Sequence, residues 1–287
     1  MAQTLYPPAG PQSVGQVLDT GFRIFKMSLV ACLLYGALSM IAGQLPNIYL
    51  IASGKPLVSF GNGEPVWIAL YIVGTLITLV FWGAMLFRQR GIAVGNRLSS
   101  RAELWGAIRK LPASAGVMGI MIVFLSLTGA VVLLIVMAMG IGFVPANFLM
   151  IAAIGLVVSI PVVYLSTPLV VAGVSLLLED TGPWRSFRYS LRLMRGSWWR
   201  TTAVLTIALI VMMVYYGVIL MIVGMVAPLL GATDFTTVSA LGGVIGVVLG
   251  SIGMPFLSAT MLAIYGDLKV RREGIDLERR VAGIASA

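Results

Sequence analysis

Acidic side chains are the main candidates for chemistry in this sequence, because it contains no His and a single Cys. The absence of His removes the commonest general base and metal ligand, and one Cys cannot form a paired-cysteine zinc site. The carboxylates that could serve a lipid-modifying enzyme are Glu179, Asp180, Asp267, Glu273, Asp276 and Glu278. They are interleaved with Arg or Lys, so solvated ion pairing or helix capping is the simpler explanation. We therefore predict no catalytic residues, no metal and no cofactor.

A second group of chemically distinctive residues lies on a predicted amphipathic helix from Trp184 to Trp199. Asp180 or Thr181 can cap this helix, and Pro183 suits its first turn. An arginine face beside an aromatic stripe is typical of a helix lying among lipid headgroups. It predicts a site for an anionic lipid or a protein partner, and ordinary interfacial anchoring is the alternative. The candidate binding residues are Arg185, Arg188, Arg192, Arg195, Trp184, Trp198 and Trp199.

Long apolar segments must position these groups. Apolar residues make up 59% of the 287 positions and charged residues 10%, whereas soluble domains carry about 25% charged residues. Runs of this length and uniformity predict membrane-spanning helices and not barrel strands. The expected fold is an all-α integral membrane domain with six spans. The spans are predicted at 27–45 with a possible extension to 52, and at 66–87, 113–142, 148–178, 201–230 and 238–265.

The distribution of positive charge predicts the orientation of the spans. Of the 19 Lys and Arg residues, only Lys55 lies in a connection that follows an odd-numbered span. Cytoplasmic connections carry an excess of Lys and Arg, so both termini are expected on the cytoplasmic side of a bacterial inner membrane. The same bias explains the net charge of +9, and we do not expect nucleic acid binding.

The chain also suggests a threefold repeat in which an amphipathic cytoplasmic helix precedes each of three membrane hairpins. The cytoplasmic helices are expected at 13–26, 100–110 and 184–199, and Gly91, Gly182 and Gly274 recur just beyond the even-numbered spans. The predicted domain covers residues 13–278, with possible repeats at 13–98, 99–182 and 183–274. Residues 1–12 and 279–287 are expected to be flexible tails.

Small residues in the last span predict close helix packing. Gly242, Gly246 and Gly250 recur every four residues, which lets another helix approach. The partner is either a helix of the same chain or a second protomer, and the oligomeric state is left open. Pro161, Pro168 and Pro255 should kink the fourth and sixth spans.

Two segments resemble a known family. SLRLMRGSWWR at 190–200 and YGDLKVRREGIDLE at 265–278 are similar to the membrane domain attached to some bacterial glycerophosphoryl diester phosphodiesterases, and to related six-span proteins. The resemblance implies that hydrolysis in the fused enzymes belongs to a separate soluble barrel. The His, Glu and Asp set of that barrel is missing here, so the resemblance does not predict this activity.

The sequence therefore favours a non-catalytic membrane protein that organises lipids or partner proteins through its basic cytoplasmic helices. A channel or permease component for a small neutral or amphiphilic solute is the first alternative, supported by the kinked spans and their scattered hydroxyl groups. A lipid-modifying enzyme that uses Glu179, Asp180 and Asp267 is the second.

Overall fold

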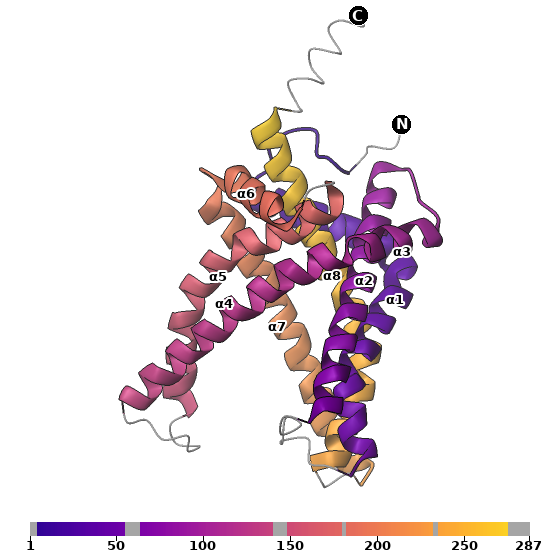
Figure 1. The fold of residues 1–287 in the computed structure, drawn as a ribbon, viewed down its shortest axis with the longest axis vertical. Helices are drawn as coiled ribbons and strands as arrows, with labels where there is room; N and C mark the ends of the chain where they lie inside the picture. Colours follow the sequence, from indigo (N-terminus) through magenta and orange to yellow (C-terminus); the bar gives the residue numbers. More distant parts are fainter. Residues whose placement is uncertain (1–4, 55–63, 140–147, 180–181, 232–234, 275–287) are drawn as a thin grey trace, which may run out of the picture.

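The computed structural model describes residues 5–54, 64–139, 148–179, 182–231 and 235–274. Within these ranges all regular secondary structure is α-helical, which confirms the predicted all-α class (Figure 1). The helices are α1 Val14–Ala52, α2 Pro65–Val94, α3 Ser100–Arg109, α4 Leu111–Ala138, α5 Phe148–Leu178, α6 Pro183–Met194, α7 Trp198–Leu229 and α8 Phe235–Glu273.

Five of these helices are long and apolar enough to cross a bilayer, namely α1, α2, α4, α7 and α8. A span needs about 20 apolar residues, and each of the five is longer than that. Helix α5 coincides with the fourth predicted span and has 31 residues, of which Ser166–Leu178 form a further apolar stretch. The chain thus has the helices expected of a multi-pass membrane protein.

Helix α1 joins two elements that the sequence predicts as separate. An amphipathic helix at 13–26 was expected before the first span, but one helix of 39 residues runs through both. Ser13 caps its start, since the Ser13 hydroxyl accepts from the Gln16 amide and the Gln16 side chain accepts from the Ser13 amide. The two predicted elements are continuous because no Gly or Pro interrupts the backbone between Arg23 and Met27.

Residues 5–12, which the sequence places in a flexible tail, are held against α2 and α8. The Leu5 amide donates to the Ala93 carbonyl over 3.0 Å. Tyr6 is buried, and its ring lies so close to Gly266 that an added Cβ there would be 3.0 Å from a ring carbon. The segment is therefore anchored where it approaches α1. The predicted tail at 279–287 lies outside the described residues.

Proline and glycine together bring α1 against α2. Pro46 of α1 has no amide hydrogen, so the Ala42 carbonyl lacks its usual helical donor. Gly74 of α2 packs on this carbonyl, and a Cβ added at Gly74 would lie 2.3 Å from the oxygen. Close Cα–H contacts to carbonyl oxygens recur between packed helices, so the freed carbonyl and the glycine form one contact.

A second contact between a glycine and a carbonyl freed by proline brings α1 against α8. Pro255 frees the Ser251 carbonyl, and a Cβ added at Gly36 of α1 would lie 2.5 Å from that oxygen. One turn along, the fully buried Gln89 side chain of α2 donates to the Pro255 carbonyl over 2.8 Å and accepts from the Ser258 hydroxyl. The proline kink of α8 is therefore filled from two neighbouring helices.

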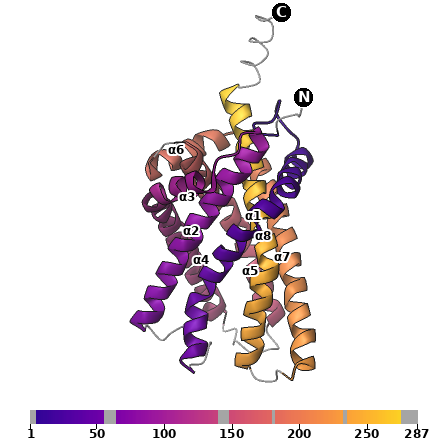
Figure 2. The ribbon, with the colours of Figure 1, turned by 90° about the vertical axis from the view of Figure 1, so that its right-hand side faces the viewer.

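The main buried core lies at one end of the bundle. We call the end where α1 begins and α8 ends the terminal end, and the opposite end the distal end (Figures 1 and 2). Core residues at the terminal end come from α1, α2, α5, α6, α7 and α8, and include Leu86, Val174, Met194 and Leu262. Toward the distal end, α4 and α5 diverge from α1, α2 and α8 (Figure 1). Apolar surface left exposed there suits a protein surrounded by lipid tails.

Lys110 fixes the short helix α3 and the start of α4 to the end of α5. Its ammonium group donates to the carbonyls of Leu176, Leu177 and Glu179 over 3.1, 2.9 and 3.2 Å. A cation at a helix C-terminus satisfies carbonyls that have no intrahelical donor and complements the helix dipole. This contact sets the position from which the chain enters α6.

Consecutive long helices pack against each other in the pairs α1 with α2, α4 with α5, and α7 with α8. Helices α3 and α6 precede the second and third pairs as separate short helices. Gly91 lies inside α2, which instead ends at Gly95 in the left-handed conformation with φ 82°. The repeat of this unit along the chain stays a prediction.

Candidate functional site

Helix α6 lies at the terminal end with one face on the core (Figures 1 and 2). Its N-cap is Gly182, followed by Pro183 in the first turn, whereas Asp180 and Thr181, the predicted caps, lie outside the described residues. The side chains it buries follow helical spacing and are Ser186, Ser190, Leu193 and Met194. The core contact therefore fixes which face of α6 points outward.

The outward face carries the predicted arginines. Arg185, Arg188, Arg192 and Arg195 are all exposed, and Trp184 is 60% exposed. The Arg188 guanidinium lies 5.2 Å from the centroid of the Trp184 ring, a cation–π contact worth about 0.5–1 kcal/mol at an exposed site. Within the described residues, no carboxylate forms an ion pair with these four arginines.

The two tryptophans after α6 have different environments. Trp198 is half-buried, its indole N–H donates to the Tyr164 carbonyl over 2.8 Å, and the two rings stack with centroids 5.1 Å apart. Trp199 is 72% exposed, although its ring centroid lies 4.6 Å from that of Tyr164. Trp198 therefore holds the start of α7 to α5, while Trp184 and Trp199, which come before and after the arginines in the sequence, are exposed.

A polar joint beneath α6 connects it to α5 and α8. Glu179 accepts from the Lys269 ammonium over 2.6 Å and from the Tyr265 hydroxyl over 2.9 Å. Burial alone raises the pKa of Glu179, but the hydrogen bonds from Lys269 and Tyr265 outweigh it and hold the pKa below its usual range. Tyr189 of α6 donates to Glu273, and burial together with this bond raises the pKa of Tyr189.

Asp267 forms a second joint, between α7, α8 and the N-terminal segment. Its carboxylate accepts from Arg200 over 2.8 Å, from Arg271 over 3.0 Å and from the Gln12 amide over 2.7 Å. The sequence suggested solvated ion pairing or helix capping for Asp267. The residue does pair with Arg200 and Arg271, but it is buried, so the expected solvation is wrong. The reason is that residues 5–12 and α7 cover this part of α8. Arg200 and Gln12 were not predicted as site residues.

A third cluster joins α1, α2 and α3. Arg88 pairs with Glu103 at 2.7 Å, and Tyr35 donates to the same Glu103 oxygen over 3.0 Å. Arg88 also donates to the Ala31 carbonyl over 2.8 Å and to the Ser100 hydroxyl over 2.6 Å. Glu103 is only 2% exposed. Sequence reasoning missed this pair, although Glu103 is the one acidic residue between the second and third predicted spans.

These joints define what the carboxylates can do chemically. Glu179 and Asp267, two of the candidate catalytic residues, each accept hydrogen bonds from cations that fix one helix to another. Asp180, Asp276 and Glu278 lie outside the described residues. In the described part of the chain, no three His, Cys, Asp or Glu side chains are grouped so that they could hold a metal ion.

The predicted packing glycines of α8 face different surroundings. A Cβ added at Gly250 would lie 2.6 Å from the Met40 methyl carbon of α1, and one at Gly242 would lie 3.6 Å from a Val223 methyl carbon of α7. A Cβ at Gly246 would meet no atom within 4 Å. The structure therefore does not bring the three glycines against one common partner helix.

Comparison with known proteins places the chain in a family whose role is unknown. Residues 105–267 match the family model described as a domain of unknown function, DUF7847. The matched range begins within α3, contains α4 to α7 and ends at Asp267. No curated protein and no solved structure matches the chain. Because the matched range covers more than half of the 287 residues, this protein belongs to the DUF7847 family.

Proposed function

We propose that this protein is a non-catalytic, six-span inner-membrane protein that binds anionic lipid headgroups at its cytoplasmic face through α6. The observation that carries the proposal is the outward face of α6, where Arg185, Arg188 and Arg192 are exposed, as is Arg195 at the C-cap. In the sequence these arginines are flanked by the exposed Trp184 and Trp199. The opposite face of the helix is buried in the core. The arginines are thus presented by a fixed element and not by a loose tail.

The chemistry of this face suits phosphate groups in the headgroup layer. Arg presents a planar set of donors that matches phosphate oxygens in pairs. Each basic residue near an anionic surface contributes about 1 kcal/mol, so four arginines provide a few kcal/mol in total. Tryptophan rings favour the same layer, because they are apolar in body and carry one hydrogen-bond donor. The polar and aromatic groups of α6 would therefore occupy one depth.

The placement of α6 in the membrane rests on two further inferences. We count α5 as a span in addition to the five named above, which gives six in total, because α5 has 31 residues and runs antiparallel to α4. We assign the terminal end to the cytoplasm, because every Lys and Arg among the described residues lies toward that end. They fall near the start of α1 and α7, near the end of α2 and α8, in α3 or α6, or in the short connections beside them. The resemblance to membrane domains of fused phosphodiesterases also favours a role without hydrolysis.

The test compares lipid selectivity of the purified protein with that of a variant lacking three arginines. Arg185, Arg188 and Arg192 are changed to Gln, and binding of phosphatidylglycerol and phosphatidylcholine is measured by native mass spectrometry. We expect the parent protein to prefer phosphatidylglycerol and the variant to lose about tenfold or more in that preference. The preference of the parent should also weaken with added salt, because exposed charges are screened.

A matched control removes the same charge from α3 and the turn before it. Arg97, Arg101 and Arg109 are also exposed, and their change to Gln should leave most of the preference intact. Equal losses in both variants would mean that net charge, and not α6, selects the lipid. Unchanged lipid selectivity with loss of a co-purifying protein would instead assign α6 to a protein partner.

The channel or permease hypothesis has one observation in its favour, which is an open groove between α1 and α8 at the distal end. The groove lies between two neighbouring helices and is lined mostly by apolar residues. It therefore suits an amphiphilic ligand better than it suits a water-filled pathway through the bundle. Transport through the bundle would be supported if reconstituted protein moved a neutral amphiphile between leaflets, and the parent and a groove-filled variant differed in that rate.

A further inference from the structure

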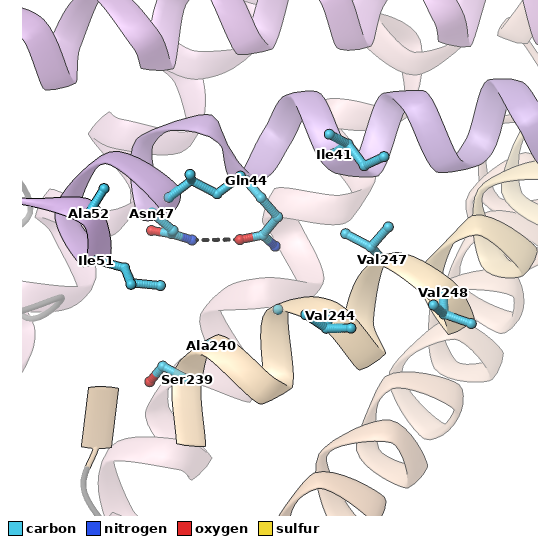
Figure 3. Close-up of a pocket in the computed structure, with 12 residues that line it drawn as sticks. Ile41, Gln44, Asn47, Ile51, Ala52, Ser239, Ala240, Val244, Val247 and Val248 are labelled. Carbon is cyan, nitrogen blue, oxygen red and sulfur yellow. Dashed lines mark hydrogen bonds between the residues drawn. The ribbon is translucent and has the colours of Figure 1, made fainter. Parts of the chain in front are cut away.

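The distal groove lies between the last turns of α1 and the first turns of α8 and has a volume of about 630 Å³ (Figure 3). Volumes of this size are typical of sites for small molecules. The wall from α1 includes Ile41, Gln44 and Asn47, and the wall from α8 includes Ser239, Gly243 and Val247. Among the described residues that line the groove, none carries a charge.

The groove exists because α1 and α8 separate beyond their close contact. At the contact, a Cβ added at Gly36 would lie 2.5 Å from the Ser251 carbonyl oxygen, and one at Gly250 would lie 2.6 Å from Met40. Nearer the distal end, the nearest atom to a Cβ added at Gly243 is the Gln44 side-chain oxygen at 4.0 Å. Small residues on α8 thus leave space that no described side chain fills.

Two amides give this apolar groove a polar wall. Asn47 donates to the Gln44 side-chain oxygen over 2.8 Å, and both side chains point toward α8 (Figure 3). After this bond forms, the Gln44 NH₂ group can still donate hydrogen bonds and the Asn47 side-chain oxygen can still accept them. In a lipid environment, polar groups without partners are costly. A ligand with both donors or acceptors and apolar chains would complete the site.

The depth of the amides identifies the class of ligand. At 1.5 Å per residue, Gln44 and Asn47 lie about 12 and 8 Å along the axis from the end of α1 at Ala52. The interfacial layer extends roughly 5–7 Å beyond the hydrocarbon core on each side. With the end of α1 at the membrane surface, Asn47 falls close to the boundary where glycerol esters lie, and Gln44 falls about one helical turn deeper, beside the first part of the acyl chains.

We propose that the distal groove binds one glycerolipid from the leaflet opposite α6, with an acyl chain along the apolar wall and its ester and glycerol oxygens at Gln44 and Asn47. The described residues that line the groove carry no charge, which distinguishes it from the arginine face of α6, because none of these lining side chains selects an anionic headgroup. This inference requires α1 and α8 to span the bilayer, but it does not require α6 to bind lipid.

The test uses the full chain in nanodiscs that contain phosphatidylcholine with a photoactivatable acyl chain. Crosslinked peptides are mapped by mass spectrometry, and we expect labelling of both groove walls above that of the exposed faces of α4 and α7. Gly243→Leu fills the groove and should lower labelling of these walls about fivefold or more. Gly246→Leu is the matched control. Gly246 is also a glycine of α8, one turn away from Gly243, but it does not line the groove.

The polar part of the proposal is tested with Gln44→Leu and Asn47→Leu together. This double variant should lose labelling by the phospholipid but keep labelling by a photoactivatable hydrocarbon without ester groups. Thermal unfolding in detergent checks that each variant is folded. Equal labelling of the groove and of α4 and α7 in the parent protein, or no effect of Gly243→Leu in a folded variant, would overturn the proposal.

Discussion

The ion pair with Arg88 compensates for the burial of the Glu103 carboxylate, so changing either residue alone should destabilise the fold. Removing one partner of a buried ion pair costs about 3–5 kcal/mol, because the other charge stays buried without compensation. Arg88→Met should therefore lower the free energy of unfolding in detergent by that amount. Arg101→Met, on the exposed side of α3, should change it by less than about 0.5 kcal/mol.

The double variant separates a buried charge from lost packing. Replacing both partners of a buried pair by apolar residues is often nearly neutral, so Arg88→Met with Glu103→Leu should recover much of the loss seen in Arg88→Met. If Arg88→Met alone is as stable as the parent, Glu103 is reached by water and the burial described above is incorrect.

For single residues, the sequence predicted on which side of the membrane the charged side chains lie, but it did not predict their ion-pair partners. Arg200 and Asp267 are 67 positions apart, and Arg88 was counted only as one of the cations that set orientation. A partner of this kind is determined by which helix ends meet in three dimensions. The exposed arginines of α6 were predictable because their spacing within one helix is a local property.

Single glycines control how closely the long helices approach, which is a property of elements. Gly36→Ala places a methyl group against the Ser251 carbonyl and should destabilise the fold by about 1–3 kcal/mol, as overpacking does. Gly43→Ala, in the same helix, meets nothing within 4 Å and should be neutral or stabilising by up to about 1 kcal/mol. Thermal unfolding of both variants in one detergent is the measurement. Equal stability of the two would show that α1 and α8 are further apart than described.

The existence and approximate limits of the helices follow from the sequence, because long apolar runs have few alternatives in a bilayer. Their pairing is harder to predict. Pro255 was predicted as a kink and Pro46 was not, and the glycines that pack on the carbonyls freed by these two prolines belong to other helices. The merging of the predicted helix at 13–26 into α1 has a local cause, the lack of a breaking residue before Met27.

The joint at Glu179 holds α5 to α8 and makes the stability of the whole molecule sensitive to acid. Its pKa is lowered in the folded protein, so the unfolded chain binds the proton more tightly. The stabilisation is then present above the unfolded pKa, near 4, and is lost as pH falls through the folded value. The difference in stability between the parent and Glu179→Gln should be largest near pH 7 and should shrink toward low pH.

Asp19→Asn provides the control for this pH dependence. The Asp19 pair with Arg23 is mostly exposed, and surface pairs contribute about 0–1 kcal/mol. Unfolding midpoints of the parent and both variants should be measured from pH 7 to about pH 2, because the contribution of Glu179 is lost below its unfolded pKa. A difference between the parent and Glu179→Gln that does not change with pH would mean that the carboxylate charge is irrelevant to the joint.

The orientation of the molecule is the last property that follows from charge. Positive residues are concentrated at the terminal end, so this end should face the cytoplasm. Cys32 is buried and is the one cysteine of the chain, so Cys32→Ala gives a background for thiol labelling. In intact cells, a membrane-impermeant maleimide should label Ser53→Cys at the distal end, whereas Asn96→Cys at the terminal end should react only after permeabilisation. Both positions are exposed, so labelling reports the side of the membrane and not burial. The reverse pattern would place α6 outside the cell and remove the basis for its assignment to the cytoplasmic leaflet.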